Sequence, residues 1–305
     1  MNRIISLLCP TRGRPDRVCV MLESIIKTTE KLENVEILFY IDRDDDKKDD
    51  YIASINNLLN KYNNPFKRVL PHIGEPISIS KSWNIIAEKC EGDILVMAND
   101  DEVWITKGWD RRLNEEADKF PDDIYCIYFD DGSNRYRNCS FPMVSRKWYE
   151  TLGYFTPGIF EFAANDIWIE NIARIINRLH YVSDVLIEHR HFLFNKSKMD
   201  ETYKKNINQY FGNHSDGKFF DSEYCMNKRL EDAKKLSIRM ELNKIEIINN
   251  FIEQNNKIIE LENNIKNIKL CYGYNINKII DALAWWIPIR KWRDNFRNKM
   301  LNLNS

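Results

Sequence analysis

Short, nearly continuous apolar runs alternate along this chain with segments whose apolar residues recur at helical spacing. Residues 4–9 form the first run and are followed by a helical pattern at residues 18–28. Residues 35–41 form the second run, and another helical pattern follows at residues 51–62. A strand that is apolar at nearly every position is buried on both faces. The alternation therefore predicts an α/β fold with a mostly parallel sheet and helices on both of its faces.

The same alternation continues, in a more mixed form, to about residue 191. Further strands are expected at residues 69–73, 93–98, 124–129, 141–144 and 182–188, and further helices at residues 80–90 and 166–179. Together these segments predict one large α/β domain over residues 1–222, which is long enough to bury a sizeable core.

The composition changes after residue 222. Residues 225–270 contain no glycine or proline, and their isoleucines and leucines recur in steps of three and four. This spacing predicts a long helix over residues 223–270 that forms a coiled coil with register shifts. Such a helix offers a surface for a homo-oligomer, although Asn255 and Asn256 interrupt its apolar seam.

The last segment, residues 271–305, is basic, with six Lys or Arg against two Asp. After Pro288, apolar residues form one stripe that is flanked by arginines, and Trp285 and Trp286 precede it. This pattern predicts a basic amphipathic helix that lies on a membrane surface. The alternative is a helix packed on its own domain or on a dimer partner.

The overall charge is nearly balanced, since 45 Lys and Arg face 46 Asp and Glu. We therefore expect no nucleic-acid partner. The seven cysteines include no pair with CxxC spacing, which predicts reduced thiols, no zinc site and a cytoplasmic location. No stretch reaches the roughly 18 apolar residues of a membrane span.

Polar residues follow three of the expected strands directly. They are Pro10, Thr11 and Arg12 after the first strand, Asp42 after the second, and Asn99, Asp100 and Asp101 after the strand at residues 93–98. Ligands of open α/β sheets bind outside the carboxyl ends of the strands, so we expect these residues to share one site. The alternative is that each Asp serves only its own turn.

The cluster at Asn99, Asp100 and Asp101 offers oxygen ligands of the kind that Mg²⁺ or Mn²⁺ prefers. These cations commonly join one or two carboxylates to the phosphates of a substrate. A second acidic run, residues 44–46, lies among further charged residues and is expected to be a solvated loop.

From residue 4 to about residue 191 the sequence resembles family 2 glycosyltransferases of the GT-A fold. The resemblance rests on the segment from Cys9 to Pro15, on Asp42 at the end of the second strand, and on the spacing from Asn84 through Gly92-Asp93 to the acidic cluster. Two positions depart from the family pattern. Asn99 stands where an Asp is usual, and Trp83 stands where an Arg is usual.

The resemblance implies a catalytic domain over residues 1–222 that moves a sugar from a nucleotide diphospho-sugar, with Mn²⁺ or Mg²⁺ as cofactor. The acceptor implied is a glycan or a lipid-linked intermediate of a bacterial surface polysaccharide. The enzyme would work on the cytoplasmic face of the inner membrane. The donor-binding residues implied are Pro10, Thr11, Arg12, Asp42, Lys81, Asn84, Asn99 and Asp100.

By the same resemblance, Asp166 near the start of a helix is the general base, and transfer inverts the anomeric centre. Glu161 is the competing candidate for the base. The structural alternative is that Asp166 only stabilises the first turn of its helix.

Metal binding is assigned to Asp101 and to a late histidine, as in several GT-A enzymes. Of His189 and His191 we expect only one to enter the site, and His189 fits that place better. The alternative is a half-buried strand histidine.

Two other functions remain open from the sequence. A nucleotidyltransferase would need a Gly-rich, Lys-containing phosphate loop after the first strand, and Thr11–Pro15 is a poor version of one. A catalytically degenerate domain that serves as a coiled-coil scaffold is favoured only by Asn99.

Overall fold

The computed structural model of the protein describes residues 3–204, 215–240, 257 and 260. The chain divides into two compact units. The first comprises Met1–Glu170 and Arg178–Lys218, and the second comprises Asn171–Asn177 and Phe219–Ser305. Most of the predicted coiled coil and all of the predicted basic tail lie outside the described residues.

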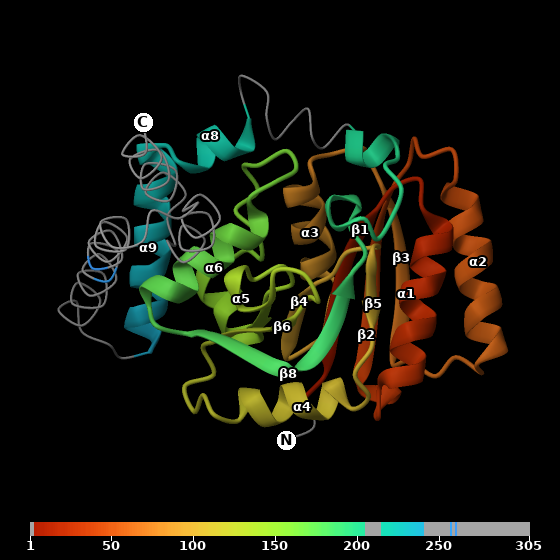
Figure 1. Ribbon diagram of the computed structural model, residues 1–305, viewed down its shortest axis with the longest axis horizontal. Helices are drawn as coiled ribbons and strands as arrows, with labels where there is room; N and C mark the ends of the chain where they lie inside the picture. Colours follow the sequence, from red (N-terminus) through yellow and green to blue (C-terminus); the bar gives the residue numbers. More distant parts are fainter. Residues whose placement is uncertain (1–2, 205–214, 241–256, 258–259, 261–305) are drawn as a thin grey trace, which may run out of the picture. The chain divides into compact units, whose positions relative to one another are not determined.

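An eight-stranded sheet forms the centre of the first unit, in the order β3-β2-β1-β4-β7-β6-β8-β5 (Figure 1). Its strands are β1 (Ile5–Thr11), β2 (Val35–Asp42), β3 (Arg68–Gly74), β4 (Ile94–Met97), β5 (Glu102–Trp104), β6 (Cys126–Asp130), β7 (Met143–Ser145) and β8 (Leu179–His189). β3, β2, β1 and β4 are parallel, and so are β6 and β8, whereas β7 and β5 run antiparallel to their neighbours. The predicted mostly parallel α/β sheet is therefore confirmed.

Helices lie beside this sheet in Figure 1, with α1 and α2 next to the strands β1–β3. The helices of the first unit are α1 (Pro15–Thr28), α2 (Lys48–Lys61), α3 (Ile79–Glu88), α4 (Trp109–Ala117) and α5 (Arg146–Leu152), with the short turns η1 (Leu32–Asn34), η2 (Arg135–Arg137) and η3 (Phe192–Phe194). α6 (Asn165–Ile175) and α8 (Asp216–Phe220) each cross from one unit to the other. All four positions of β4 and the first seven of β2 are buried, as strands covered on both faces require.

The structure contains several elements that were not expected from the sequence, namely the strand β5, the helices α4, α5 and α8, and the short turns η1, η2 and η3. One predicted helix also ends at a different residue. The helix predicted over residues 166–179 ends earlier, at Ile175, because Asn177 adopts a left-handed conformation with φ +56° and β8 begins at Leu179.

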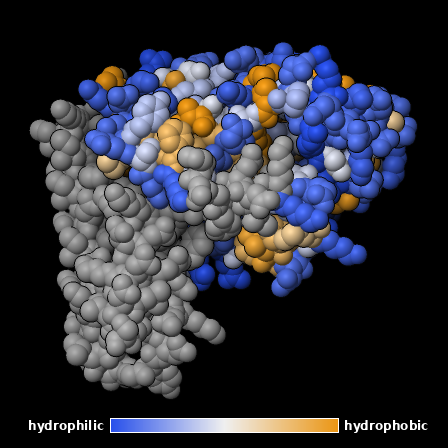
Figure 2. Space-filling view, turned by 90° about the horizontal axis from the view of Figure 1, so that it is seen from above, coloured by the Kyte–Doolittle hydropathy of each residue, from blue (hydrophilic) through white to orange (hydrophobic). Residues whose placement is uncertain are grey.

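In the second unit, α9 (Glu223–Arg239) is the principal described element. The Ser222 hydroxyl caps its first turn by accepting a 3.2 Å hydrogen bond from the backbone N–H of Cys225. Among the residues that the structure describes, no helix has both the length and the apolar character to cross a bilayer. The described surface seen in Figure 2 is largely hydrophilic and carries scattered hydrophobic residues.

Candidate functional site at the carboxyl edge of the sheet

The polar clusters that follow β1 and β4 meet at one edge of the sheet. Thr11 is the last residue of β1, and its hydroxyl donates a 2.8 Å hydrogen bond to Oδ2 of Asp100, just beyond β4. The Thr11 hydroxyl also lies 2.9 Å from the Tyr51 hydroxyl. Because β1 and β4 are parallel neighbours, their carboxyl ends bring these side chains together as expected.

Arg14 occupies the centre of this edge with a side chain that is only 9% exposed. It donates a 2.9 Å hydrogen bond to Oδ1 of Asp100 and two more, of 2.8 and 2.7 Å, to the carboxylate of Asp200. Both oxygens of Asp100 therefore have protein partners. Burial raises the pKa of Asp100, and the Arg14 charge partly offsets that rise.

Asp101 lies beside His189, with Oδ1 3.4 Å from the histidine Nε2. The pairing of β5 with β8, in which Glu102 faces His189, creates this contact. Oδ2 of Asp101 accepts a 2.7 Å hydrogen bond from the Tyr203 hydroxyl. Burial alone would raise the pKa of Asp101, but the neighbouring His189 and Tyr203 hold it well below its usual range.

His189 is partly buried, and its Nδ1 atom has no hydrogen-bond partner. Burial opposes its charge, yet the Asp101 carboxylate raises its pKa above the usual value. A carboxylate and an imidazole in contact fit a divalent cation, which would take its other ligands from water and substrate phosphates. Among the described residues, no group of three or more His, Cys, Asp or Glu forms a complete metal cage.

The expectation that only one of the two histidines enters the site was wrong. Side chains two residues apart in a strand lie on the same face, and β8 ends at His189. The rings of His189 and His191 lie 5.3 Å apart, and the His191 ring lies 4.6 Å from that of Tyr203. Burial lowers the pKa of His191 to about 4.

Arg12 and Asp42 form the opposite end of the site. Arg12 donates a 2.7 Å hydrogen bond to Oδ2 of Asp42 and also contacts the carboxylate of Asp44. The prediction that residues 44–46 form a solvated loop was wrong for Asp45. Its side chain is buried and accepts hydrogen bonds from the backbone N–H of Gly13 (2.7 Å) and of Lys47 (2.9 Å). Asp45 therefore fixes the loop after β1.

Lys81 and Asn84, two further residues assigned to the donor site, belong to α3. The Asn84 side chain makes three hydrogen bonds to backbone groups. Its Oδ1 accepts from the N–H groups of Phe155 (2.9 Å) and Thr156 (3.0 Å), and its Nδ2 donates to the Thr156 carbonyl (2.8 Å). Lys81 is exposed on the first turns of α3. Trp83 is buried, and its indole N–H donates a 2.9 Å hydrogen bond to the Leu8 carbonyl.

The remaining two donor-site candidates lie near the strand ends. Pro10 is half-buried within β1, opposite Tyr40 of β2. Asn99 is half-buried just after β4, and its backbone N–H donates a 3.2 Å hydrogen bond to Oε1 of Glu102.

Asp166 lies in the first turn of α6 and is half-buried. Burial raises its pKa to about 6, with a further contribution from the Glu170 carboxylate. A carboxylate with a pKa near neutrality suits general base catalysis. Glu161, the competing candidate, is exposed to solvent.

Sequence reasoning missed the residues that join these parts, namely Arg14, Tyr51, Asp200 and Tyr203. Arg14 lies within the Cys9–Pro15 segment that carries the family resemblance, and it could have been identified from the sequence as a cation that faces the acidic cluster. Asp200 and Tyr203 lie in a stretch without strand or helix periodicity, so no pattern in the sequence marks them.

Comparisons with known proteins agree with this architecture. The family described as "Glycosyl transferase family 2" matches residues 6–168, which is more than half of the chain. This match confirms the family resemblance and the prediction of a glycosyltransferase, and it disfavours a nucleotidyltransferase. No match is found among curated proteins.

Three solved structures are similar to this chain. The mannosyltransferase PcManGT from Pyrobaculum calidifontis, in complex with GDP-Man and Mn²⁺, has a TM-score of 0.51 at 12% identity and covers 98% of this chain and 87% of its own. GalNAc-T7 with UDP, GalNAc and Mn²⁺ has a TM-score of 0.53 at 13% identity and covers 76% and 54%. S. aureus TarS has a TM-score of 0.48 at 14% identity and covers 72% of this chain, which spans 45% of that protein. The first two confirm the predicted GT-A fold.

Proposed function

The chain belongs to glycosyl transferase family 2 and is a glycosyltransferase, and we propose that it moves a sugar from a nucleotide diphospho-sugar to a hydroxyl group of a glycan or a lipid-linked glycan. The single observation that carries the donor class is the contact between Asp101 and His189 at the carboxyl edge of the sheet. A divalent cation there would need oxygen ligands from outside the protein, and a diphosphate supplies them. The Mn²⁺ and the GDP-Man or UDP named for PcManGT and GalNAc-T7 support this proposal.

In this proposal Asp101 and His189 hold Mn²⁺ or Mg²⁺. The bound cation would offset the negative charge that develops on the departing nucleoside diphosphate. In the same proposal Thr11, Arg12 and Asp42 contact the nucleoside side of the donor. Their hydrogen bonds at the ends of β1 and β2 support this assignment.

Asp166 acts on the acceptor in this proposal. The acceptor oxygen attacks C1 of the sugar, and its proton passes to the Asp166 carboxylate. The new bond joins that oxygen to C1, the bond from C1 to the diphosphate oxygen breaks, and the nucleoside diphosphate leaves. A single displacement of this kind inverts the configuration at C1.

The test is a thermal-shift screen of UDP-, GDP-, CMP- and dTDP-sugars, each with Mn²⁺ and with EDTA. A ligand that binds only the folded protein raises the melting temperature by mass action. One nucleotide class should shift the wild-type protein in Mn²⁺ and not in EDTA. Asp101→Ala should abolish both the shift and sugar transfer.

The matched control is Asp46→Ala, which removes an exposed carboxylate from the loop after β2. This variant should keep the metal-dependent shift and full transfer. Full transfer by folded Asp101→Ala would overturn the metal role of Asp101. A wild-type protein that responds to no donor in the panel would contradict the donor class.

We also propose that the C-terminal segment attaches the enzyme to the cytoplasmic face of the inner membrane, with the coiled coil as a route to a homo-oligomer. The support is the pattern of tryptophans, apolar stripe and arginines in residues 271–305. A chain truncated before Tyr274 should lose binding to anionic liposomes that the full chain retains. Equal partitioning of the two chains would sink this proposal.

A further inference from the structure

The segment directly before Asp166 is held by a carboxylate from much later in the chain. Asp216 accepts hydrogen bonds from three consecutive backbone N–H groups, of Glu161 at 3.0 Å and of Phe162 and Ala163 at 2.7 Å each. The Asp216 side chain is buried, with 7% of its surface exposed. Hydrogen bonds from backbone N–H groups to a buried carboxylate are short and strong.

The turn between this segment and α6 needs such support. Ala164 adopts the left-handed conformation, with φ +69°, which costs an alanine energy that neighbouring contacts must offset. The Asn165 side chain closes the turn from within by donating to the Phe162 carbonyl at 3.1 Å. Asp166 follows immediately, so the position of its carboxylate depends on this turn.

The other side of the segment is fixed to α3. The Glu161 carbonyl accepts a 3.0 Å hydrogen bond from the backbone N–H of Ile79, and the Ser80 hydroxyl accepts one of 2.9 Å from Gly158. Residues 158–163 are therefore held between α3 on one side and the Asp216 carboxylate on the other.

We propose that Asp216 is a positioning residue, which orients Asp166 toward the acceptor hydroxyl by holding the backbone of residues 161–163. This inference rests on the proposed function, in which Asp166 is the base. Asp216 itself touches neither the donor edge nor the reacting atoms.

Asp216→Asn is the informative variant because it keeps the shape of the side chain. Two of the three N–H groups bond to Oδ2 and one to Oδ1, so either orientation of the amide places an NH₂ group against a backbone donor. The turn should loosen while the rest of the domain stays folded. Loss of base alignment should lower kcat for transfer by about 100-fold.

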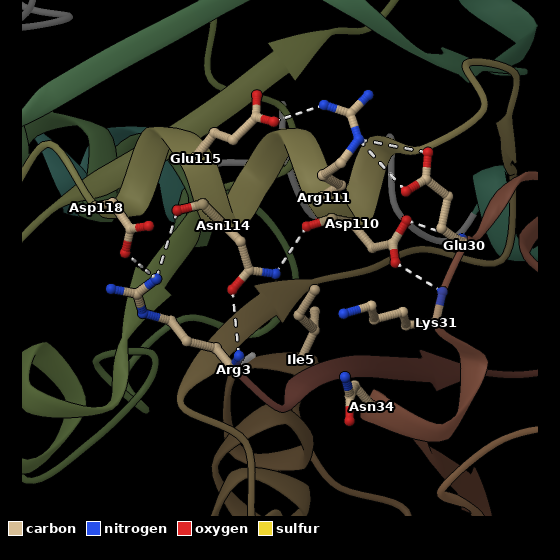
Figure 3. Close-up of a pocket in the computed structure, with 10 residues that line it drawn as sticks. All are labelled: Arg3, Ile5, Glu30, Lys31, Asn34, Asp110, Arg111, Asn114, Glu115 and Asp118. Carbon is tan, nitrogen blue, oxygen red and sulfur yellow. Dashed lines mark hydrogen bonds and ion pairs between the residues drawn. The ribbon is translucent and has the colours of Figure 1, made fainter. Parts of the chain in front are cut away.

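The matched control is Asp110→Asn. Asp110 is equally buried and accepts two backbone hydrogen bonds of 3.0 Å, from Glu30 and Lys31. It lines a cavity of about 220 Å³ beside Ile5, the first residue of β1 (Figure 3). Thr11 is the last residue of that strand. A purely structural loss should affect both variants alike, in proportion to the fall in melting temperature.

Three measurements on the full-length protein test the proposal. Hydrogen exchange of the peptide over residues 158–166 should accelerate in Asp216→Asn and stay unchanged in Asp110→Asn. The donor-induced thermal shift should be retained in both. The acid limb of the pH profile of kcat/KM should move in Asp216→Asn and not in Asp110→Asn, because only the first substitution changes the environment of Asp166.

Unchanged exchange at residues 158–166 would show that Asp216 does not hold the segment and would overturn the proposal. Faster exchange with full transfer would overturn the positioning role. A wild-type protein without transfer to any acceptor would contradict the proposed function instead, while the exchange experiment would still report whether Asp216 holds the turn.

Discussion

The Tyr203 hydroxyl donates a 2.7 Å hydrogen bond to Oδ2 of Asp101, a residue 102 positions earlier in the chain. The same hydroxyl accepts a 2.7 Å hydrogen bond from Arg17, and the Arg14 guanidinium lies 4.1 Å from the centre of the Tyr203 ring. One side chain thus ties the acidic cluster after β4 to the basic start of α1. The residues of this edge are held in place by a segment that follows β8.

Replacing Tyr203 with Phe removes only the hydroxyl and keeps the ring beneath Arg14. The buried Asp101 carboxylate then loses a charge-assisted hydrogen bond. We expect the free energy of unfolding in EDTA to fall by about 1.5–3 kcal/mol. Urea denaturation of the two proteins measures this difference.

Tyr62→Phe is the matched control for that change. Tyr62 also donates a 2.7 Å hydrogen bond to a carboxylate, that of Glu23, but the Glu23 side chain is 32% exposed, whereas that of Asp101 is buried. Its loss should cost less than about 1 kcal/mol. An equal decrease in the free energy of unfolding of the two variants would mean that burial does not strengthen the hydrogen bond of Tyr203.

The pKa of Asp166, raised to about 6, sets the pH dependence of transfer. Below that value the carboxyl group is protonated and cannot accept the acceptor's proton. We expect kcat/KM to decrease about tenfold for each pH unit below 6 and to level off above it. A profile from about pH 3.5 to 8 tests this, and an acid limb near pH 4 would argue against Asp166 as the base.

The same pKa makes a prediction about stability. A carboxyl group whose pKa is raised in the folded protein stabilises it at low pH and loses that contribution as pH rises through about 6. Asp166→Asn should therefore raise the free energy of unfolding at pH 7.5 by about 1–2 kcal/mol, a figure reduced for partial exposure, and have little effect at pH 4.

Asp49→Asn separates this effect from ordinary helix stabilisation. Asp49 is an exposed acid in the first turn of α2, where a negative charge favours the helix. Its removal should cost about 0.3–1 kcal/mol at pH 7.5. If Asp166→Asn behaves in the same way, Asp166 is a helix-stabilising acid rather than a base poised by burial.

The sequence predicted the parts of this site that local patterns encode. The apolar runs located β1, β2 and β4, and parallel pairing then required Thr11 and Asp100 to meet. β5 escaped prediction because it has three residues and begins with an acid, Glu102. The pairing of β5 with β8 nevertheless brings Asp101, which directly precedes β5, next to His189.

Long-range burial is what the sequence could not show. Asp45 reads as one more charge in an acidic run, and only the folded loop reveals that it is buried against the backbone of Gly13. Tyr203 and Asp200 have no periodic neighbours, so their contacts with Arg14 follow from chain folding alone.

Asn84 gives the sharpest contrast between resemblance and structure. The resemblance assigns it to the donor site, whereas its side chain makes three hydrogen bonds to the backbone of Phe155 and Thr156. Asn84→Ala should lower the free energy of unfolding by about 2–3 kcal/mol because buried backbone groups lose their partners. Donor affinity, measured by calorimetry in the presence of Mn²⁺, should stay at the wild-type value.

Asn57→Ala, an exposed substitution on α2, serves as the control for removing an amide from a helix and should change neither quantity. Weaker donor binding by an Asn84→Ala protein of normal stability would restore the donor-site assignment. Lower stability with intact donor binding would show that Asn84 is a structural residue. Asn84 then fixes residues 155–156 at the start of the same loop that Asp216 holds at residues 161–163, so side chains that do not contact the donor anchor both ends of the segment before the base.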